Sequence, residues 1–325
     1  MAEAQSLPGV PTYKDRSTGL MAFGIVQVLM GFGMAGMALL MTVMALLPPA
    51  PNAGMEPRAM APAVLMYLLL AVAGVWLGIG SCLARRWARA LTLMLAWMGL
   101  LVGLVALAAL AALAGHFREM LPRQPEMPAG AMVVMQVVMF ATVLVIYILV
   151  PGIFVLFYQS KHVWATCQAR DPKIRWTDKA PLPVIALSLC LAFGAAYMPT
   201  MAAYNFTIPL FGKMIQGMPG AAVCLAMSLI NAILAYQLYK LRPAAWWATL
   251  IFFGLGSLSS LVTFSRIHMV DLYKAMNMPE KQLEMMRPML PLMERMIPWG
   301  TAASMGAALV YLLWIRRYFT GKNAD

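Results

Sequence analysis

Hydrophobic positions along the chain fall into eight long runs separated by polar segments. Each run has roughly 17 or more residues without a charged side chain, enough to cross about 30 Å of hydrocarbon as an α-helix. The first run is nearly thirty residues long and follows Lys14, Asp15 and Arg16, so it is interpreted as a retained span rather than a signal peptide. The predicted spans are residues 19–47, 63–84, 90–115, 131–158, 184–204, 220–239, 244–264 and 299–315.

Composition agrees with this pattern. Of the 325 residues 62% are hydrophobic and only 11% are charged, and the mean hydropathy is +0.76. Such a chain has too little polar surface to cover a soluble globule. The predicted fold class is therefore an all-α, polytopic integral membrane protein.

The sequence resembles itself at an offset of 157 residues, which aligns Arg85 with Arg242 and Thr92 with Thr249. The same offset places Gly99 on Gly256 and residues 154–157 on 311–314. Each half then contains four spans, so both halves enter the membrane in the same orientation. The predicted organisation is a cytoplasmic N-terminal segment (1–18), a first four-helix repeat (19–158), a basic cytoplasmic linker (159–183), a second repeat (184–315) and a cytoplasmic tail (316–325).

The net charge of +12 is spread over short loops and forms no basic domain, so nucleic acid is not predicted as a partner. In the eight-span arrangement 15 Lys and Arg residues lie on the side of both termini and 9 on the opposite side. The excess places both termini in the cytoplasm, with the plasma (inner) membrane as the expected location. Membrane lipids are expected partners, and other membrane proteins or a second copy of the chain are further candidates.

Small residues four positions apart predict close helix contacts, because helices gain little from burying apolar side chains away from lipid. Such pairs occur at Gly74 and Gly78, at Gly99 and Gly103, and at Gly256 and Ser260. Pro151 is expected to bend the fourth span or to mark its inner limit.

Groups that could carry catalysis are scarce. No Asp, Glu, Lys, Arg or His lies well inside a predicted span, and no phosphate-loop or nucleophile-turn motif occurs. The three histidines, His116, His162 and His268, are isolated, and the four cysteines include no Cys-x-x-Cys pair. The sequence therefore predicts no enzyme, no catalytic residue, no cofactor and no metal centre.

Uncharged polar residues inside the spans allow two interpretations. Gln27, Gln136 and Asn231 either form hydrogen bonds between helices or line a polar substrate path. The first is favoured, because such bonds are the common use of amides in membrane helices.

Methionine is abundant, with 31 copies, and five form a stripe on one helical face: Met30, Met34, Met37, Met41 and Met44. Thioethers suit soft ions such as Cu(I), so the stripe could hand a metal along. They also fill irregular apolar surfaces. A packing seam between helices is the favoured interpretation.

The function expected from these features is that of a scaffold, accessory or assembly component of a membrane complex. The alternative is a transporter or channel for a small neutral or soft-cationic solute, Cu(I) among them.

Overall fold

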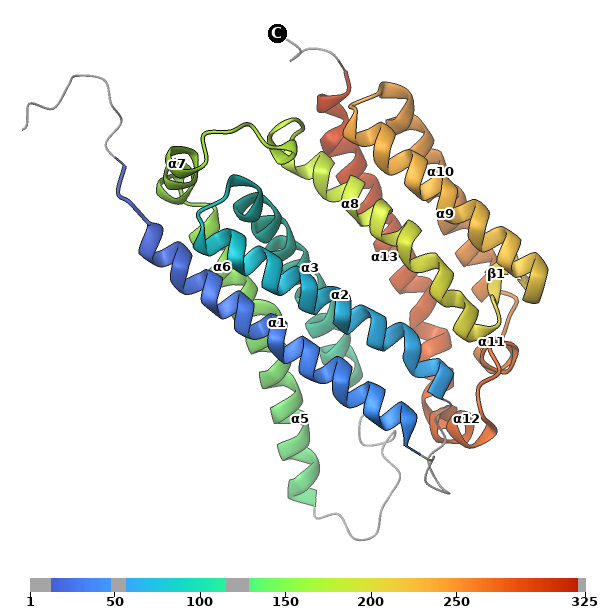
Figure 1. Cartoon of the computed structure of the whole chain (residues 1–325). Coiled ribbons are helices and arrows are strands. Elements are labelled where there is room, and N and C mark those ends of the chain that lie inside the picture. The colour runs from blue at the N-terminus through green and yellow to red at the C-terminus, as the bar shows by residue number, and fades with distance from the viewer. Residues whose placement is uncertain (1–12, 48–56, 115–128, 321–325) are drawn as a thin grey trace, which may run out of the picture. The chain divides into compact units, whose positions relative to one another are not determined.

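The computed structural model describes residues 13–47, 57–114 and 129–320 (Figure 1). The described residues contain eight segments long and apolar enough to cross a membrane, which confirms the predicted helical membrane class. They are Ser17–Leu46, Met60–Cys82, Arg86–Ala111, Val133–Tyr158, Leu182–Tyr204, Gly217–Tyr239, Pro243–Phe264 and Leu290–Tyr318. The last begins at Leu290 rather than at residue 299, because Pro291 sits in the first helical turn and Pro298 is accommodated within the helix.

The chain divides into two compact units, and each is described by itself. The first comprises Met1–Gly33, Leu70–Ala114 and Glu126–Lys179. Helices α1 (Ser17–Leu46) and α2 (Pro57–Cys82) each contribute one half to it. Its other elements are α3 (Arg86–Ala114), α5 (Ala129–Val143), the π-helix η1 (Leu144–Leu149), α6 (Val150–Tyr158), α7 (Lys161–Arg170) and the 3-10 helix η2 (Trp176–Asp178).

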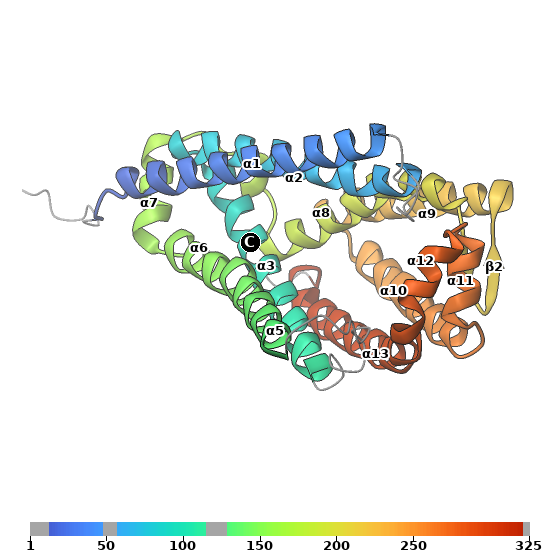
Figure 2. The ribbon, with the colours of Figure 1, turned by 90° about the horizontal axis from the view of Figure 1, so that it is seen from below.

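Helices α1 and α2 lie side by side and antiparallel (Figure 2), with backbones close together. A Cβ added to Gly78 would lie 2.6 Å from the Gly24 carbonyl oxygen, and one on Gly74 would lie 3.0 Å from the Gly31 Cα. These neighbours are backbone atoms, which cannot turn aside. The predicted face at Gly74 and Gly78 is thus a helix contact that only glycine permits.

Helix α3 packs on η1 and α6, and the fit depends on Pro151. Proline has no N–H and its ring would collide with the carbonyl four residues earlier, that of Tyr147. The chain widens into a π-turn here, where the Val150 N–H donates to the Val145 carbonyl. The Tyr147 carbonyl then lies against Gly103, where a Cβ would overlap it. The helix continues to Tyr158, so Pro151 does not end the span.

A tight turn joins α2 to α3. Ala84 has a φ of 50°, the Ala84 N–H donates to the Ser81 carbonyl (2.9 Å) and the Arg85 N–H donates to the Gly80 carbonyl (2.9 Å). This left-handed cap satisfies carbonyls at the end of α2. It leaves two arginines, Arg85 and Arg86, at the start of α3.

The second unit comprises Met34–Leu69, Gly115–Pro125 and Ala180–Asp325. Besides the other halves of α1 and α2, its elements are α8 (Leu182–Tyr197), η3 (Met198–Tyr204), β1 (Ile208–Leu210), β2 (Lys213–Ile215), α9 (Gly217–Tyr239), α10 (Pro243–Phe264), α11 (Met269–Ala275), α12 (Glu280–Met286), η4 (Arg287–Met289), α13 (Leu290–Ile315) and η5 (Arg316–Tyr318).

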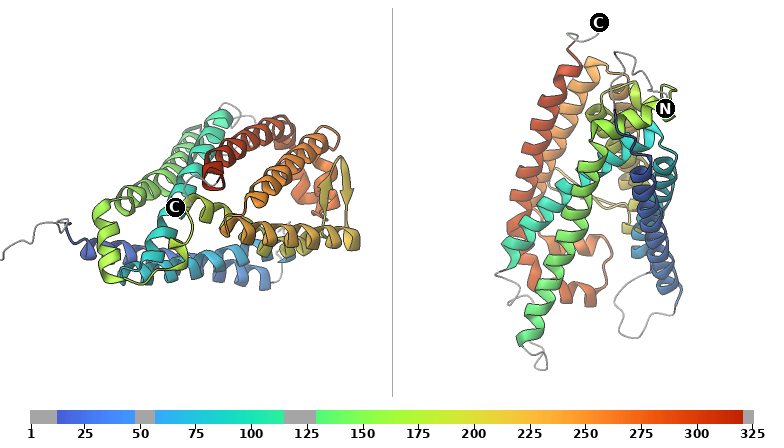
Figure 3. Two further views of the ribbon diagram at one scale, coloured as in Figure 1. Left: turned by 90° about the horizontal axis from the view of Figure 1, so that it is seen from above. Right: turned by 90° about the vertical axis from the view of Figure 1, so that its left-hand side faces the viewer.

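Helices α10 and α13 lie side by side (Figure 3) and meet around Trp246. The Trp246 Nε1–H donates to the Leu312 carbonyl at 2.8 Å, and both residues are buried. A Cβ on Gly256 would meet nothing within 4 Å. The predicted contact at Gly256 and Ser260 is therefore wrong, because α10 meets α13 through a large aromatic residue near its start.

A two-stranded hairpin, β1–β2, interrupts the helical pattern and was not predicted. Phe211 and Gly212, with φ of 46° and 79°, form its turn. The Phe211 N–H donates to Ser259 Oγ and the Gly212 N–H to Thr263 Oγ1, both at 3.0 Å. Two polar residues of α10 thus hold the hairpin tip.

We predict that Gly78→Ala lowers the free energy of unfolding by about 1–3 kcal/mol, because the methyl group must displace backbone atoms. Gly36→Ala is the matched control, since a Cβ there meets nothing within 4 Å, and it should change stability by no more than about 1 kcal/mol. Unfolding of the purified protein in a denaturing-detergent titration measures both, and equal stability of the two variants would contradict the α1–α2 packing.

Candidate functional site

Helix α7 lies across the end of α6 (Figure 1) and buries Val163, Thr166 and Cys167. Asp171 follows the helix directly, and its side chain is only 2% exposed. A carboxylate withdrawn from water to this degree is costly unless charges and hydrogen bonds compensate it. The linker can therefore pack here only if the groups around Asp171 offset the cost of burying its charge.

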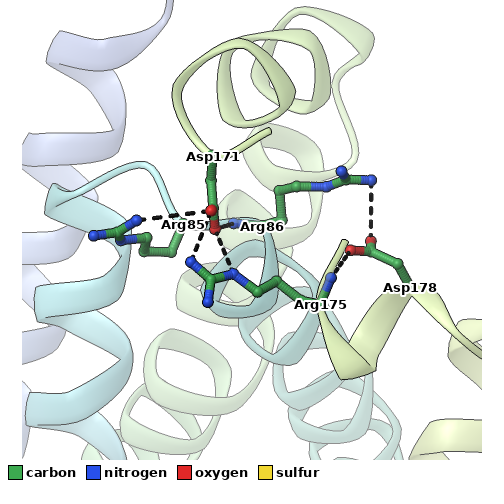
Figure 4. Close-up of polar contacts among 5 residues, drawn as sticks. All are labelled: Arg85, Arg86, Asp171, Arg175 and Asp178. Carbon is green, nitrogen blue, oxygen red and sulfur yellow. Dashed lines mark hydrogen bonds and ion pairs between the residues drawn. The ribbon is translucent and has the colours of Figure 1, made fainter. Parts of the chain in front are cut away.

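Compensation comes from three arginines (Figure 4). Arg175 binds the carboxylate with two hydrogen bonds, from Nη2 to Oδ1 at 2.8 Å and from Nε to Oδ2 at 3.1 Å. Arg85 Nη1 lies 3.7 Å from Oδ1. The backbone N–H of Arg86 donates to Oδ2 at 3.4 Å.

The bond from Arg86 also completes helix α3. The first N–H groups of a helix have no partner within it, and a negative charge is favourable at that end. The residue before the helix is Arg85, whose side chain has no acceptor. Asp171, from a segment 85 residues away along the chain, supplies the acceptor instead.

Asp178 makes a second connection. It accepts from the Arg175 N–H at 2.8 Å, and its Oδ1 lies 3.3 Å from Arg86 Nη2. Arg86 is thus held by its main chain at Asp171 and by its side chain at Asp178. The start of α3 and the linker fold as one structure.

The protonation states follow from these contacts. The hydrogen bonds from Arg175 lower the pKa of Asp171 from its ordinary value of 3.8, and the Arg86 N–H acts in the same direction against the effect of burial. Burial raises the pKa of the Cys167 thiol to about 11. At neutral pH the carboxylate is charged and the thiol is protonated, so this cluster suits binding rather than proton transfer or nucleophilic attack.

The segment before α1 joins the same surface. The Arg16 N–H donates to Thr166 Oγ1 at 3.1 Å, the Lys14 N–H donates to His162 Nδ1 at 3.3 Å, and Arg170 Nη2 lies 3.3 Å from Asp15 Oδ2. We call residues 14–17, 85–89 and 161–179 together the linker platform.

Of the predicted polar path, Gln27 and Gln136 lie in the first unit and Asn231 lies in the second. Gln27 is buried and its Nε2 donates to Thr92 Oγ1 of α3 at 3.0 Å. Asn231 is buried in α9 and its Nδ2 donates to the Met227 carbonyl of its own helix at 2.8 Å. Gln136 is half-buried in α5. The Gln27 bond joins α1 to α3 and the Asn231 bond stays within α9, and the polar path remains a prediction.

The methionine stripe of α1 is only partly buried. The buried positions of α1 are Leu20, Gly24, Gln27, Gly31 and Ala38. Met30, Met37 and Met44 are exposed, and Met34 and Met41 are half-buried. Met34 and Met41 continue the spacing of these buried positions, and the other three methionines lie off this row, so the interpretation of the stripe as a seam stays a prediction. Whether the stripe binds metal remains open.

No group of three or more His, Cys, Asp or Glu that could hold a metal occurs in the described ranges. His162 accepts the Lys14 bond, and His268 Nδ1 lies 3.5 Å from Glu294 Oε1. His116 falls outside the described residues.

The importance of Asp171 was missed by reasoning from the sequence, where it is one acidic residue in a basic linker. A usable signal was present: an aspartate directly after a helical segment, four residues before Arg175, in a chain whose α3 begins without an N-cap acceptor.

Comparison with known proteins adds no family. No protein-family model matches the chain, and neither a curated protein nor a solved structure matches it.

We predict that Asp171→Asn loosens the linker. Losing the charge weakens contacts to two guanidinium groups, a loss of about 1–3 kcal/mol. In a variant with Cys82, Cys190 and Cys224 changed to Ala, maleimide labelling of buried Cys167 should become at least about tenfold faster.

Asp15→Asn is the control, because the side chain of Asp15 is 55% exposed and such pairs contribute little. It should change the labelling rate less than about threefold.

A second check uses pH. Because the folded-state pKa of Asp171 lies below 3.8, its contribution is complete well above pH 3.8 and is lost as pH falls through the lowered value. The stability difference between wild type and Asp171→Asn should shrink accordingly, and a labelling rate unaffected by Asp171→Asn would contradict the buried cluster.

Proposed function

We propose that this chain is a non-enzymatic membrane protein that acts as a scaffold, accessory or assembly component of a membrane complex. The linker platform is the observation that supports this role. Two of its three carboxylates, those of Asp171 and Asp178, are held in ion pairs that order the linker against α3. The other side chains of the platform form an ordered, positively charged surface suited to binding a partner.

Polar groups within the spans support the same role. Gln27 bonds to Thr92, the Ser228 hydroxyl donates to the Ala195 carbonyl at 2.7 Å, and the Trp246 indole donates to the Leu312 carbonyl. Each of these bonds joins two helices. They position helix faces rather than present reactive groups.

We further propose that the chain arose by duplication with an offset of 157 residues. The turn cap at Ala84 has a counterpart at Leu241, whose φ is 55°. There the Leu241 N–H donates to the Leu238 carbonyl (2.8 Å) and the Arg242 N–H donates to the Gln237 carbonyl (3.2 Å). Each of these residues lies 157 positions after its partner in the first turn, and neither Ala nor Leu adopts a positive φ readily.

Burial follows the same offset. Gly31 corresponds to Ser188, Ala38 to Ala195 and Thr92 to Thr249, and all six are buried. Gly99 and Gly256 differ in this respect: a Cβ on Gly99 would lie 3.2 Å from Pro151 Cγ, whereas one on Gly256 would meet nothing within 4 Å. The matching buried positions of the two halves thus support a common origin, although the helix contacts at Gly99 and Gly256 differ.

Four spans in each half would bring the linker and the tail to the same side of the membrane. The excess of Lys and Arg on that side favours the cytoplasm, and the plasma (inner) membrane is the proposed location. Truncated fusions after Pro181 and after Thr320 to a fluorescent reporter and to a secreted phosphatase test this. We expect fluorescence and no phosphatase activity at both sites, and opposite sides would overturn the arrangement.

A transporter or channel for a small neutral or soft-cationic solute, Cu(I) included, is the second candidate. One observation favours it: Gln27 Oε1 is buried and has no hydrogen-bond partner in the described part of the chain. A solute or water that donates a hydrogen bond would satisfy it.

We predict that native membranes contain the chain in a complex larger than the chain alone, and that Asp171→Asn removes most of this complex while Gln27→Leu leaves it intact. Crosslinking in membranes followed by mass measurement compares the variants, with Asp15→Asn as control. Solute or Cu(I) uptake into proteoliposomes by the purified chain, abolished by Gln27→Leu, would reject the scaffold and establish the transporter.

A further inference from the structure

We propose that the linker platform binds the phosphate groups of anionic phospholipids. The inference rests on the proposed orientation, because the cytoplasmic leaflet is where anionic lipids meet a basic surface. It goes beyond that orientation by assigning a ligand class to particular side chains.

Charge is the first argument. The platform carries ten basic side chains and three acidic ones, a net charge of +7. The basic residues are Lys14, Arg16, Arg85, Arg86, Arg89, Lys161, Arg170, Lys173, Arg175 and Lys179. Each of the three acids is held by an arginine of the platform itself, so the excess positive charge has no internal compensation.

The lysines of the linker are available to a ligand. Lys161, Lys173 and Lys179 are exposed, and no ion pair involves them within the described residues. Arg89 Nε is buried without a hydrogen-bond partner in the same part of the chain. The exposed ammonium groups are suited to phosphate oxygens, and the Arg89 guanidinium adds to the positive charge of the platform.

Apolar side chains point to a lipid surface as the source of the phosphate. Trp164 is 48% and Ile174 75% exposed. Trp164 lies three residues, about one helical turn, after Lys161 in α7, so the two side chains are neighbours on the helix surface. A cation beside an exposed tryptophan is typical of an interfacial helix, which places its aromatic ring at the level of the head groups.

The position of the linker keeps it near the membrane. It begins directly after Tyr158, the last residue of one span, and ends directly before Leu182, the first residue of the next. Asp171 holds the middle of the segment to the start of α3. The linker is therefore tethered near the membrane surface at both ends and in its middle.

The test uses the full chain in neutral detergent, where both faces are accessible, so that its outcome does not depend on orientation in cells. Phosphatidylglycerol, phosphatidylcholine and inorganic phosphate are added separately, and bound lipid is measured by native mass spectrometry together with the shift in melting temperature. The variant is Lys161→Gln/Lys173→Gln/Lys179→Gln. The control removes equal charge elsewhere, as Lys213→Gln/Lys274→Gln/Lys281→Gln.

We expect wild type and control to bind phosphatidylglycerol with a higher melting temperature and the platform variant to bind it at least about tenfold more weakly. Binding should weaken as salt rises, and Trp164→Ser should weaken it without altering the response to salt. Equal binding by the platform variant, equal binding of phosphatidylcholine, or an equal shift with inorganic phosphate alone would each overturn the proposal. Lipid binding that survives while the reporter fusions place the linker outside would reject the orientation and retain the site.

Discussion

Hydrocarbon offers the backbone no hydrogen-bond partner, so each interruption of a helix must be repaired within the chain. Within a span this constraint accounts for the π-turn, and at the span ends the general need to pair buried backbone groups has the same effect. At Ala84 the left-handed cap returns two N–H groups to the end of α2. Before Pro151 the π-turn replaces the bond that proline cannot make. At the β1–β2 turn, Ser259 and Thr263 accept the N–H groups of the hairpin tip.

The same requirement applies to charge at the edge of the bundle. Asp171 is buried, and it is stable there because Arg175 and the start of α3 surround it. The interaction works in both directions, since α3 lacks an acceptor of its own at its first turn. A linker that its composition alone would leave as a polar connection thereby becomes an ordered surface. That surface lies at the end of the spans in the first unit.

The sequence predicted helix contacts well where both partners are small and poorly where one is large. Gly74 and Gly78 pack as expected on the backbone of α1, because Gly31 and Gly24 of α1 lie opposite them. A Cβ on Gly256 would meet nothing within 4 Å, since Trp246 sets the contact between α10 and α13. In α1, Met34 and Met41 continue the row of the buried residues Gly31 and Ala38, whereas Met30, Met37 and Met44 are exposed. Periodicity determines that a face exists, and only the neighbouring helix determines which face it is.

From the sequence alone follow the membrane class and the eight spans, because apolar length is a property of each segment by itself. The small-residue faces of α2 and α3 follow as well. The tertiary structure decided the rest: the partner of Gln27, the hairpin held by Ser259 and Thr263, and the burial of Asp171. These depend on side chains brought together from distant positions, and no local pattern encodes which distant group will compensate a buried polar atom.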